Sequence, residues 1–525
     1  MYLANSASHR MKPRGFSMLR CMVMLELFWL MLLAGCATPA SRVGERPMSA
    51  DEGIVRVSLA ANTGQVASWS SIEVTQVDDS GAAVSSGRKF ALVRVGGPYT
   101  RGAVMGAVRL SGILPEGGYK VSRLVDDRTS QFVDLKGGAD RLGTFRVRAG
   151  QTSDLGTLLV VIQFKAVAIA RIDEATTGNP AQVAAAGTAS GAWDRPDPKS
   201  ADILAYALQH AAGIFDVCEL QNGQVVAASR MGTVLVRESA RTWKRKRVAG
   251  IEDVYAIATY PGAVDAAKFV VGGESNLLAI VGNNEVRRIN APLPAGSIVS
   301  LHHNPAGSAW VLLLQDEELM LRAYSAPGLE SGVWKELYSV KLESPYPKVQ
   351  RPRLSVVKHP GSITIGIEDL KQDVVVNINF ETGAVRPIAV DRIAGVLAPT
   401  AGGILSAGVR GWNFKQIYSF DEGLNWMSLP ENMTSYLPTV FPSKSVEIFR
   451  DAQSAVNYVS GDAPVGKIKI SLDGGATWTE SSRVPQGKWY VVPGGTIFVS
   501  PSDAMLTSIS ESSNNGLSWT EAIVP

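Results

Sequence analysis

The octapeptide Ser419-Phe420-Asp421-Glu422-Gly423-Leu424-Asn425-Trp426 recurs twice towards the end of this 525-residue chain. The second copy is Ser471-Leu472-Asp473-Gly474-Gly475-Ala476-Thr477-Trp478, and the third is Ser512-Ser513-Asn514-Asn515-Gly516-Leu517-Ser518-Trp519. All three fit the pattern S-x-D/N-x-G-x-(T/S/N)-W, and Val236-Arg237-Glu238-Ser239-Ala240-Arg241-Thr242-Trp243 is a degenerate fourth copy. A segment that recurs in this way indicates a repeat architecture built from similar supersecondary units.

The residue types in this pattern suit a tight turn followed by a buried ring. The Asp or Asn side chain can accept hydrogen bonds from the N–H groups of its own turn, and Gly permits a positive φ. The Trp can fold back and bury its ring against a sheet. We therefore interpret the following residues as structural, and their carboxylates as unavailable for acid–base chemistry: Ser419, Asp421, Gly423, Trp426, Ser471, Asp473, Gly475, Trp478, Ser512, Asn514, Gly516 and Trp519.

These copies resemble the Asp-box, or BNR, repeats of sialidase-like β-propellers. The resemblance implies that each copy closes the hairpin between the last two strands of a blade. Trp426 and Trp478 are 52 positions apart and Trp478 and Trp519 are 41 apart, while Trp243, Trp334 and Trp426 are spaced by 91 and 92, close to two blades each. At about 45 residues per blade, residues 212–525 predict roughly seven blades.

The region before the repeats reads as a separate β domain. Residues 54–172 contain about seven alternating segments separated by Gly- and Asp-containing turns, which predicts a β-sandwich of transthyretin or immunoglobulin type. Within it, Leu114-Pro115-Glu116-Gly117-Gly118-Tyr119 resembles a turn of the transthyretin-like sandwiches, which implies a spacer or binding module. Residues 173–211 predict a linker and one short helix, capped by Ser200 and ended by Gly213. The predicted fold class is therefore all-β, an N-terminal β-sandwich followed by a roughly seven-bladed β-propeller with Asp-box repeats.

The N-terminus has the features of a bacterial export signal. Residues 1–35 combine four basic side chains with an apolar run, interrupted by Glu26, that is too short for a comfortable membrane span. The run ends in Leu33-Ala34-Gly35-Cys36, which resembles the lipobox of bacterial lipoproteins and implies that Cys36 becomes the acylated first residue, carrying palmitate. Residues 36–53 then predict a tether. Ala37 follows the cysteine in place of the Asp that retains such proteins on the inner membrane, so we expect the outer membrane of a Gram-negative cell.

Composition and charge exclude several classes of protein. With 46% hydrophobic and 19% charged residues, the chain is neither disordered nor collagen-like nor a coiled coil. Removing residues 1–35 takes away four basic residues and one acidic residue, leaving 51 − 4 = 47 basic against 48 − 1 = 47 acidic residues. A neutral chain gives no general electrostatic reason to bind nucleic acid. Three cysteines, of which Cys21 lies in the leader, form neither a disulfide framework nor a zinc site.

The sequence predicts no catalytic residue, no metal ligand and no cofactor. His302 and His303 are adjacent on a predicted strand and should face opposite ways. Sialidases carry an Arg-Ile-Pro element before the first box, whereas the nearest match here, Arg483-Val484-Pro485, follows the second box. The basic run Arg241–Arg247 predicts an outer edge strand, with an anion or lipopolysaccharide patch as the alternative.

Two functions remain open on the sequence. In the first, the chain is a membrane-anchored envelope lipoprotein whose propeller binds an unknown protein or glycan in an assembly or scaffold role. In outline it also resembles the Asp-box propellers that assist assembly of membrane complexes. In the second, it is a sialidase-like glycan hydrolase. A convergent group of Arg, Glu, Asp and Tyr at the mouth of the propeller channel would favour the second function, since scaffold alone does not imply activity.

Overall fold

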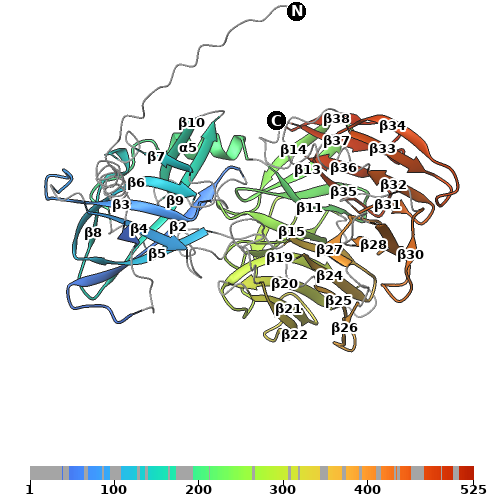
Figure 1. The fold of residues 1–525 in the computed structure, drawn as a ribbon, viewed down its shortest axis with the longest axis horizontal. Helices are drawn as coiled ribbons and strands as arrows, with labels where there is room; N and C mark the ends of the chain where they lie inside the picture. The colour runs from blue at the N-terminus through green and yellow to red at the C-terminus, as the bar shows by residue number, and fades with distance from the viewer. Residues whose placement is uncertain are drawn as a thin grey trace, which may run out of the picture.

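The computed structural model describes residues 38–39, 46–63, 69–84, 88–94, 108–126, 131–135, 140–163, 166–172, 193–211, 213–262, 267–304, 309–316, 320–342, 353–368, 374–388, 393–409, 415–430, 433, 438–450, 466–485, 487–500 and 508–524. Two β domains lie side by side in Figure 1, and the predicted all-β class is confirmed. The leader and Cys36 lie outside these described residues.

The first domain is one continuous curved sheet. Its strands are β1 (Thr38–Pro39), β2 (Glu52–Ala61), β3 (Ser71–Val77), β4 (Lys89–Arg94), β5 (Val108–Pro115), β6 (Gly117–Asp126), β7 (Gln131–Asp134), β8 (Phe145–Val147), β9 (Thr152–Gln163) and β10 (Ala166–Ile172). They run in the order β10-β9-β2-β5-β4-β3-β6-β7, while β1 pairs with β4 and β8 with β6. The two layers of the predicted sandwich are therefore joined by hydrogen bonds along this path.

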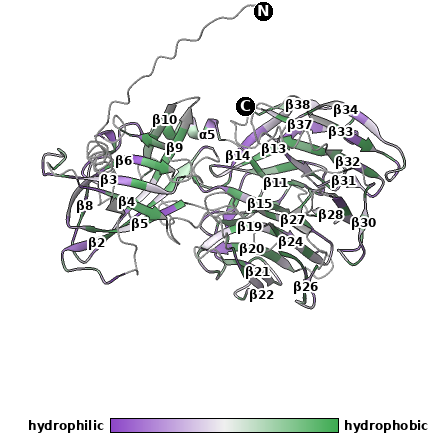
Figure 2. Cartoon of the chain, viewed as in Figure 1, coloured by the Kyte–Doolittle hydropathy of each residue, from purple (hydrophilic) through white to green (hydrophobic). Residues whose placement is uncertain are grey.

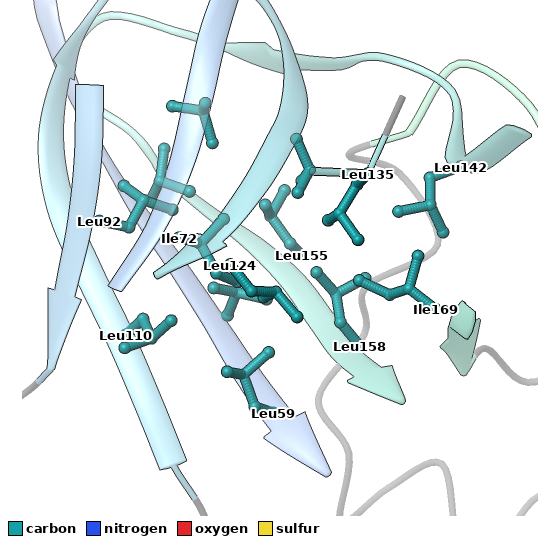
Figure 3. Close-up of a cluster of buried hydrophobic side chains, with 14 of the residues drawn as sticks. Leu59, Ile72, Leu92, Leu110, Leu124, Leu135, Leu142, Leu155, Leu158 and Ile169 are labelled. Atoms are coloured by element: carbon teal, nitrogen blue, oxygen red, sulfur yellow. The ribbon is translucent and has the colours of Figure 1, made fainter. Parts of the chain in front are cut away.

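Alternating apolar side chains fill the space that this sheet encloses. Figure 3 shows leucine and isoleucine side chains from several strands, among them Leu59, Ile72 and Leu110, gathered in one cluster. Tyr119 is completely buried in the same core, and its hydroxyl donates a 2.9 Å hydrogen bond to the Pro115 carbonyl. The turn that resembled a transthyretin element thus ties the end of β5 to the start of β6.

The first domain begins inside the segment that was predicted to be a tether. Strand β2 starts at Glu52, which pairs with Pro115, and Gly53 pairs with Leu114. The Glu52 carboxylate also accepts hydrogen bonds from Arg46 at 2.6 and 2.7 Å. Backbone pairing and an ion pair extend this strand without any apolar side chain, so hydrophobic alternation could not reveal its start.

Part of the predicted linker packs as structure. Trp193 forms a β-bridge with Phe145, and the two rings meet edge to face with centroids 5.4 Å apart. Asp197 has a fully buried side chain that is paired with Arg141 and accepts the Arg171 N–H at 3.0 Å. These contacts fasten the segment before the helix onto the first domain.

Helix α5 (Ser200–Gln209) joins the two domains. Its Leu204 and Ala207, together with Ala211, pack in one apolar cluster with Leu159 of β9 and Met231 of the propeller. The predicted capping role of Ser200 is wrong, because Lys199 occupies the N-cap position and the Ser200 hydroxyl donates to the Asp197 carbonyl at 3.0 Å. Ser200 is the first helical residue, so its side chain points back to the preceding turn.

The second domain is a propeller of seven four-stranded blades, as the sequence predicted. Blade 1 is β11 (Ile214–Glu219), β12 (Val225–Ser229), β13 (Thr233–Ser239) and β14 (Thr242–Arg247), blade 2 is β15 (Val254–Thr259), β16 (Phe269–Gly273), β17 (Leu278–Val281) and β18 (Val286–Arg288), and blade 3 is β19 (Gly296–His303), β20 (Trp310–Asp316), β21 (Met320–Ala326) and β22 (Lys335–Lys341). Blade 4 is β23 (Arg353–Lys358), β24 (Ser362–Glu368), β25 (Val374–Asn379) and β26 (Val385–Pro387), and blade 5 is β27 (Ile393–Leu397), β28 (Leu405–Val409), β29 (Lys415–Ser419) and β30 (Met427–Ser428). Blade 6 is β31 (Val440–Ser443), β32 (Val446–Arg450), β33 (Gly466–Ser471) and β34 (Thr479–Val484), and blade 7 is β35 (Lys488–Val491), β36 (Ile497–Ser500), β37 (Ser508–Ser512) and β38 (Thr520–Ile523).

The ring closes without exchange of strands between its first and last blades. Every blade is built from consecutive strands, and β14 touches β38 only through the pairing of Thr242 with Ile523. Closure therefore depends on other contacts between blades 1 and 7: Trp243 is completely buried against Phe498, and Arg237 pairs with Glu511. Figure 2 shows hydrophobic residues concentrated along the strands of both domains.

Within the described residues, no helix has the length and apolar character needed to cross a bilayer.

Candidate functional site

The three predicted boxes form the hairpins between the third and fourth strands of blades 5, 6 and 7. In the first, Ser419 Oγ donates to Asp421 Oδ1 at 2.7 Å and accepts the Gly423 N–H at 2.9 Å. Asp421 Oδ1 also accepts the Asn425 N–H at 2.8 Å, and the Trp426 indole N–H donates to the Gly423 carbonyl at 3.2 Å. This network holds Gly423 at a φ of 82°.

The other two copies repeat this network. The Gly475 and Gly516 N–H groups donate to the preceding serine hydroxyls at 2.8 Å in each case. Asp473 accepts the Thr477 N–H at 2.8 Å, and Asn514 accepts the Ser518 N–H at 2.9 Å.

Hydrogen bonds within the turns keep the box carboxylates ionised. Donation from the Asn425 backbone, above all, lowers the pKa of Asp421 to about 2. Donation from the Thr477 side chain is the main cause that lowers the pKa of Asp473 to about 2. A carboxylate held this strongly as an acceptor is a poor proton donor near neutral pH.

The box tryptophans are less buried than their expected role as wedges requires. Trp426, Trp478 and Trp519 are all half-buried, and each packs against the edge of an apolar cluster. Trp243 of the degenerate copy is instead completely buried, between blades 1 and 7. Trp243 is therefore the tryptophan that fills the space between two blades of the propeller.

Exposed apolar side chains gather on these same hairpins. In the described part of the propeller, six large apolar residues that are 40–73% exposed lie on or beside the hairpins between third and fourth strands, namely Val286, Val333, Leu424, Met427, Leu472 and Leu517. All blades share one topology, so these hairpins lie at one face of the ring. We call this set the hairpin rim. Its members come from blades 2, 3, 5, 6 and 7.

The basic run lies in β14, the outer strand of blade 1, as predicted. Lys246 Nζ donates to the Gly282 carbonyl and, at 2.9 Å, to that of Asn283. Arg247 donates to the Gly250 carbonyl at 2.9 Å. Since these cations already bind backbone carbonyls, the contacts favour the edge-strand interpretation over an anion patch.

An ion pair crosses the central channel. Asp216 lies on the first strand of blade 1 and Lys358 on the first strand of blade 4, yet Asp216 Oδ2 and Lys358 Nζ are 3.1 Å apart. First strands line the channel of a propeller, so a contact between blades three positions apart must span it. Asp216 Oδ2 also accepts the Ile257 N–H of blade 2 at 3.2 Å.

Lys488 lies beside this ion pair. It is the first residue of β35, its Nζ donates to the Phe215 carbonyl at 3.1 Å, and the ammonium lies 5.0 Å from the centre of the Tyr490 ring. The side chain is exposed, yet loss of bulk solvent around it lowers the pKa of Lys488 to about 8, with the charge of Asp216 acting in the opposite direction. Exposure together with desolvation is expected of a side chain on the wall of a narrow channel.

A group of Arg, Asp, Tyr and Glu lies at the same mouth of the channel, where the first strands of blades 1 and 2 begin. Arg230 is paired with Asp253 and lies 4.7 Å from the centre of the Phe215 ring. Tyr255 donates a 2.7 Å hydrogen bond to Glu274, which also accepts the Asp253 N–H at 3.0 Å. Burial is the main cause that raises the pKa of Glu274 to about 8. Tyr255 and Asp253 are almost completely buried, so this group chiefly joins blade 1 to blade 2.

His302 and His303 have different neighbours, so they do not meet at one site. His302 Nε2 lies 3.0 Å from the His359 carbonyl oxygen, and burial lowers the pKa of His302 to about 3. His303 instead faces Trp310, with ring centroids 5.0 Å apart. Arg483, Val484 and Pro485 lie at the end of β34, away from the first box. Among the described residues, no group of three or more His, Cys, Asp and Glu side chains could hold a metal ion.

The charged residues of the channel were not predicted from the sequence. Asp216, Lys358 and Lys488 are far apart in the chain, and only the order of the blades brings them together. The sequence feature that could have indicated them is a charged residue in a largely apolar first strand of a blade, as in Ile214–Glu219 and Lys488–Val491.

No protein-family model matches the chain, and no curated protein matches it. Among solved structures it is similar to YCF48 bound to D1 peptide, with 15% identity, a TM-score of 0.40, and coverage of 57% of this chain and 93% of that chain. It is similar to YCF48 from Cyanidioschyzon merolae, with 13% identity, a TM-score of 0.40, and coverage of 57% and 95%. It is also similar to the Myceliophteria thermophila Cps50 (Swd1) β-propeller domain, with 10% identity, a TM-score of 0.31, and coverage of 46% and 80%.

Proposed function

We propose that this chain is a lipid-anchored protein of the bacterial cell envelope, placed in the outer membrane, whose propeller binds a protein partner through the hairpin rim. The observation that carries the proposal is the concentration of exposed apolar side chains on one set of hairpins. Large apolar side chains that are exposed together on one face of a protein point to an interaction site. Leu424, Leu472 and Leu517 lie on the hairpins of three consecutive blades.

Turn networks make the rim a rigid binding surface. Each box leucine lies within a loop whose Ser and Asp or Asn side chains are hydrogen-bonded to its own backbone. A preorganised loop loses little conformational entropy when a partner binds. Binding loops held on a rigid scaffold are a common way for such folds to carry function.

The triple variant Leu424→Ser, Leu472→Ser and Leu517→Ser should capture at least about tenfold less partner, because it removes the apolar contacts that would dominate the interface. Capture is measured by affinity purification from cross-linked envelopes. Phe132→Ser is the matched control, since Phe132 is 56% exposed on the first domain. Equal capture by the triple variant and the wild type, at unchanged melting temperature, would refute the rim as the binding surface.

Anchoring is tested by Cys36→Ser. We expect complete loss of label from a palmitate analogue and loss of mature protein from the membrane fraction, since several acyl chains on one residue are what hold such a protein in a membrane. Cys218→Ser serves as the control, because Cys218 is a half-buried residue of β11. Labelling that survives in Cys36→Ser would contradict the proposal.

Glycan hydrolysis is the second candidate function, and the Tyr255–Glu274 hydrogen bond of 2.7 Å is the observation that favours it. Against it, Tyr255 is 3% exposed and the Arg230 guanidinium is already paired with Asp253. We therefore expect the purified protein to release no sugar from sialylated or other envelope glycans. Release that Glu274→Gln or Tyr255→Phe abolishes would establish the hydrolase instead.

A further inference from the structure

We propose that the channel mouth at which the first strands begin is a binding site for a single carboxylate group, with Lys488 as its cationic partner. This site lies at the opposite face of the ring from the hairpin rim, because the first strands begin at one end of the blades and the box hairpins lie at the other. The inference is therefore independent of the proposed binding through the rim.

The Asp216–Lys358 ion pair forms the floor of the site. It spans the channel at 3.1 Å, and Asp216 is held further by the Val217 and Ile257 N–H groups at 2.9 and 3.2 Å. A ligand that enters the mouth cannot pass this level while the pair is formed.

Lys488 adds a positive charge that the Asp216–Lys358 ion pair does not neutralise. It is the first residue of its strand, and its contact is with Phe215, one position before Asp216, so it lies on the mouth side of the floor. Asp216 is already paired with Lys358, and Lys488 forms no ion pair with any described residue. One positive charge therefore remains over the floor.

Among the described residues, the other charged groups near the mouth already have partners. Arg230 is paired with Asp253, and Glu274 accepts hydrogen bonds from Tyr255 and the Asp253 N–H. Glu219 lies at the far end of β11, where it accepts the Gly494 N–H at 2.9 Å. An incoming anion would consequently meet Lys488, whose ammonium lies 5.0 Å from the centre of the Tyr490 ring.

A single ammonium group at the channel mouth favours a ligand with one negative charge. One ammonium group can form a charge-assisted hydrogen bond with a carboxylate and neutralise it, and a desolvated wall strengthens that interaction. A chain terminus with small side chains fits this description, as does a free small acid.

The experiment titrates the full-length protein in detergent with N-acetyl-trialanine carrying a free carboxylate, and with the same peptide as its C-terminal amide. We expect the acid to bind at least about tenfold more tightly than the amide, and Lys488→Gln to lose that preference. Lys488→Arg should retain it. Lys444→Gln is the control, since Lys444 is exposed on the turn between the first two strands of blade 6, at the rim face.

A second readout is the titration of Lys488 followed by NMR of labelled lysine side chains. Binding of the acid should raise the pKa of Lys488 from its value of about 8, because the bound carboxylate stabilises the ammonium form. Titration with acetate alone distinguishes the two possible ligands. If acetate binds as tightly as the peptide acid, the ligand is a free small acid; if only the peptide acid binds, the ligand is a chain terminus. Equal affinity for acid and amide, or an unchanged preference in Lys488→Gln, would overturn the site.

Discussion

Trp243→Ala is expected to lower the free energy of unfolding by about 3–5 kcal/mol, the range for deleting a fully buried large aromatic side chain. The ring is completely buried and meets Phe498 of blade 7 edge to face, with centroids 5.6 Å apart. Because β14 and β38 share only one residue pair, closure between blades 1 and 7 depends on this packing together with the Arg237–Glu511 ion pair. Chemical denaturation of the purified protein measures the loss.

Trp426→Ala provides the comparison, since Trp426 is half-buried and its loss opens no enclosed cavity. We expect Trp426→Ala to cost clearly less than Trp243→Ala. Equal losses for the two variants would show that closure of the ring does not rest on Trp243.

Asp197→Ala is expected to cost a similar amount, about 3–5 kcal/mol, because removing one partner of a buried ion pair leaves the other charge uncompensated. The Asp197 side chain is fully buried, pairs with Arg141, and accepts the N–H groups of Arg171 and Lys199 at 3.0 and 3.1 Å. Thermal unfolding of the first domain is the measurement.

Asp202→Ala is the matched control on the same segment. Asp202 forms an exposed pair with Lys199, and exposed pairs contribute about 0–1 kcal/mol. Should Asp197→Ala unfold no more easily than Asp202→Ala, the segment before α5 would be a linker after all.

Local patterns predicted the propeller well, because each box is a self-contained turn whose residues bind one another. Its blade count followed from the spacing of Trp243, Trp334 and Trp426, which reflects the constant size of a blade. The start of β2 and the packing of Trp193 were missed, because backbone pairing and long-range ring contacts leave no periodic trace.

The candidate sites were harder to predict than the fold. Asp216 and Lys358 are 142 positions apart and meet only because blades 1 and 4 face each other across the ring. The exposure of Leu424 and Leu472 could not be read from the repeat, since the same hairpins also hold the half-buried Trp426 and Trp478. The meeting of Asp216 with Lys358 arises from closure of the ring, a property that no single segment encodes.

Photo-crosslinking in living cells tests the central claim, that the rim binds a protein partner, most directly. A benzophenone amino acid is placed at Leu424, Leu472 or Leu517, and at Phe132 of the first domain as the exposed control. We predict one discrete crosslinked protein shared by the three rim positions and missing from Phe132. Rim positions that yield no adduct, or the same adduct from Phe132, would contradict the claim.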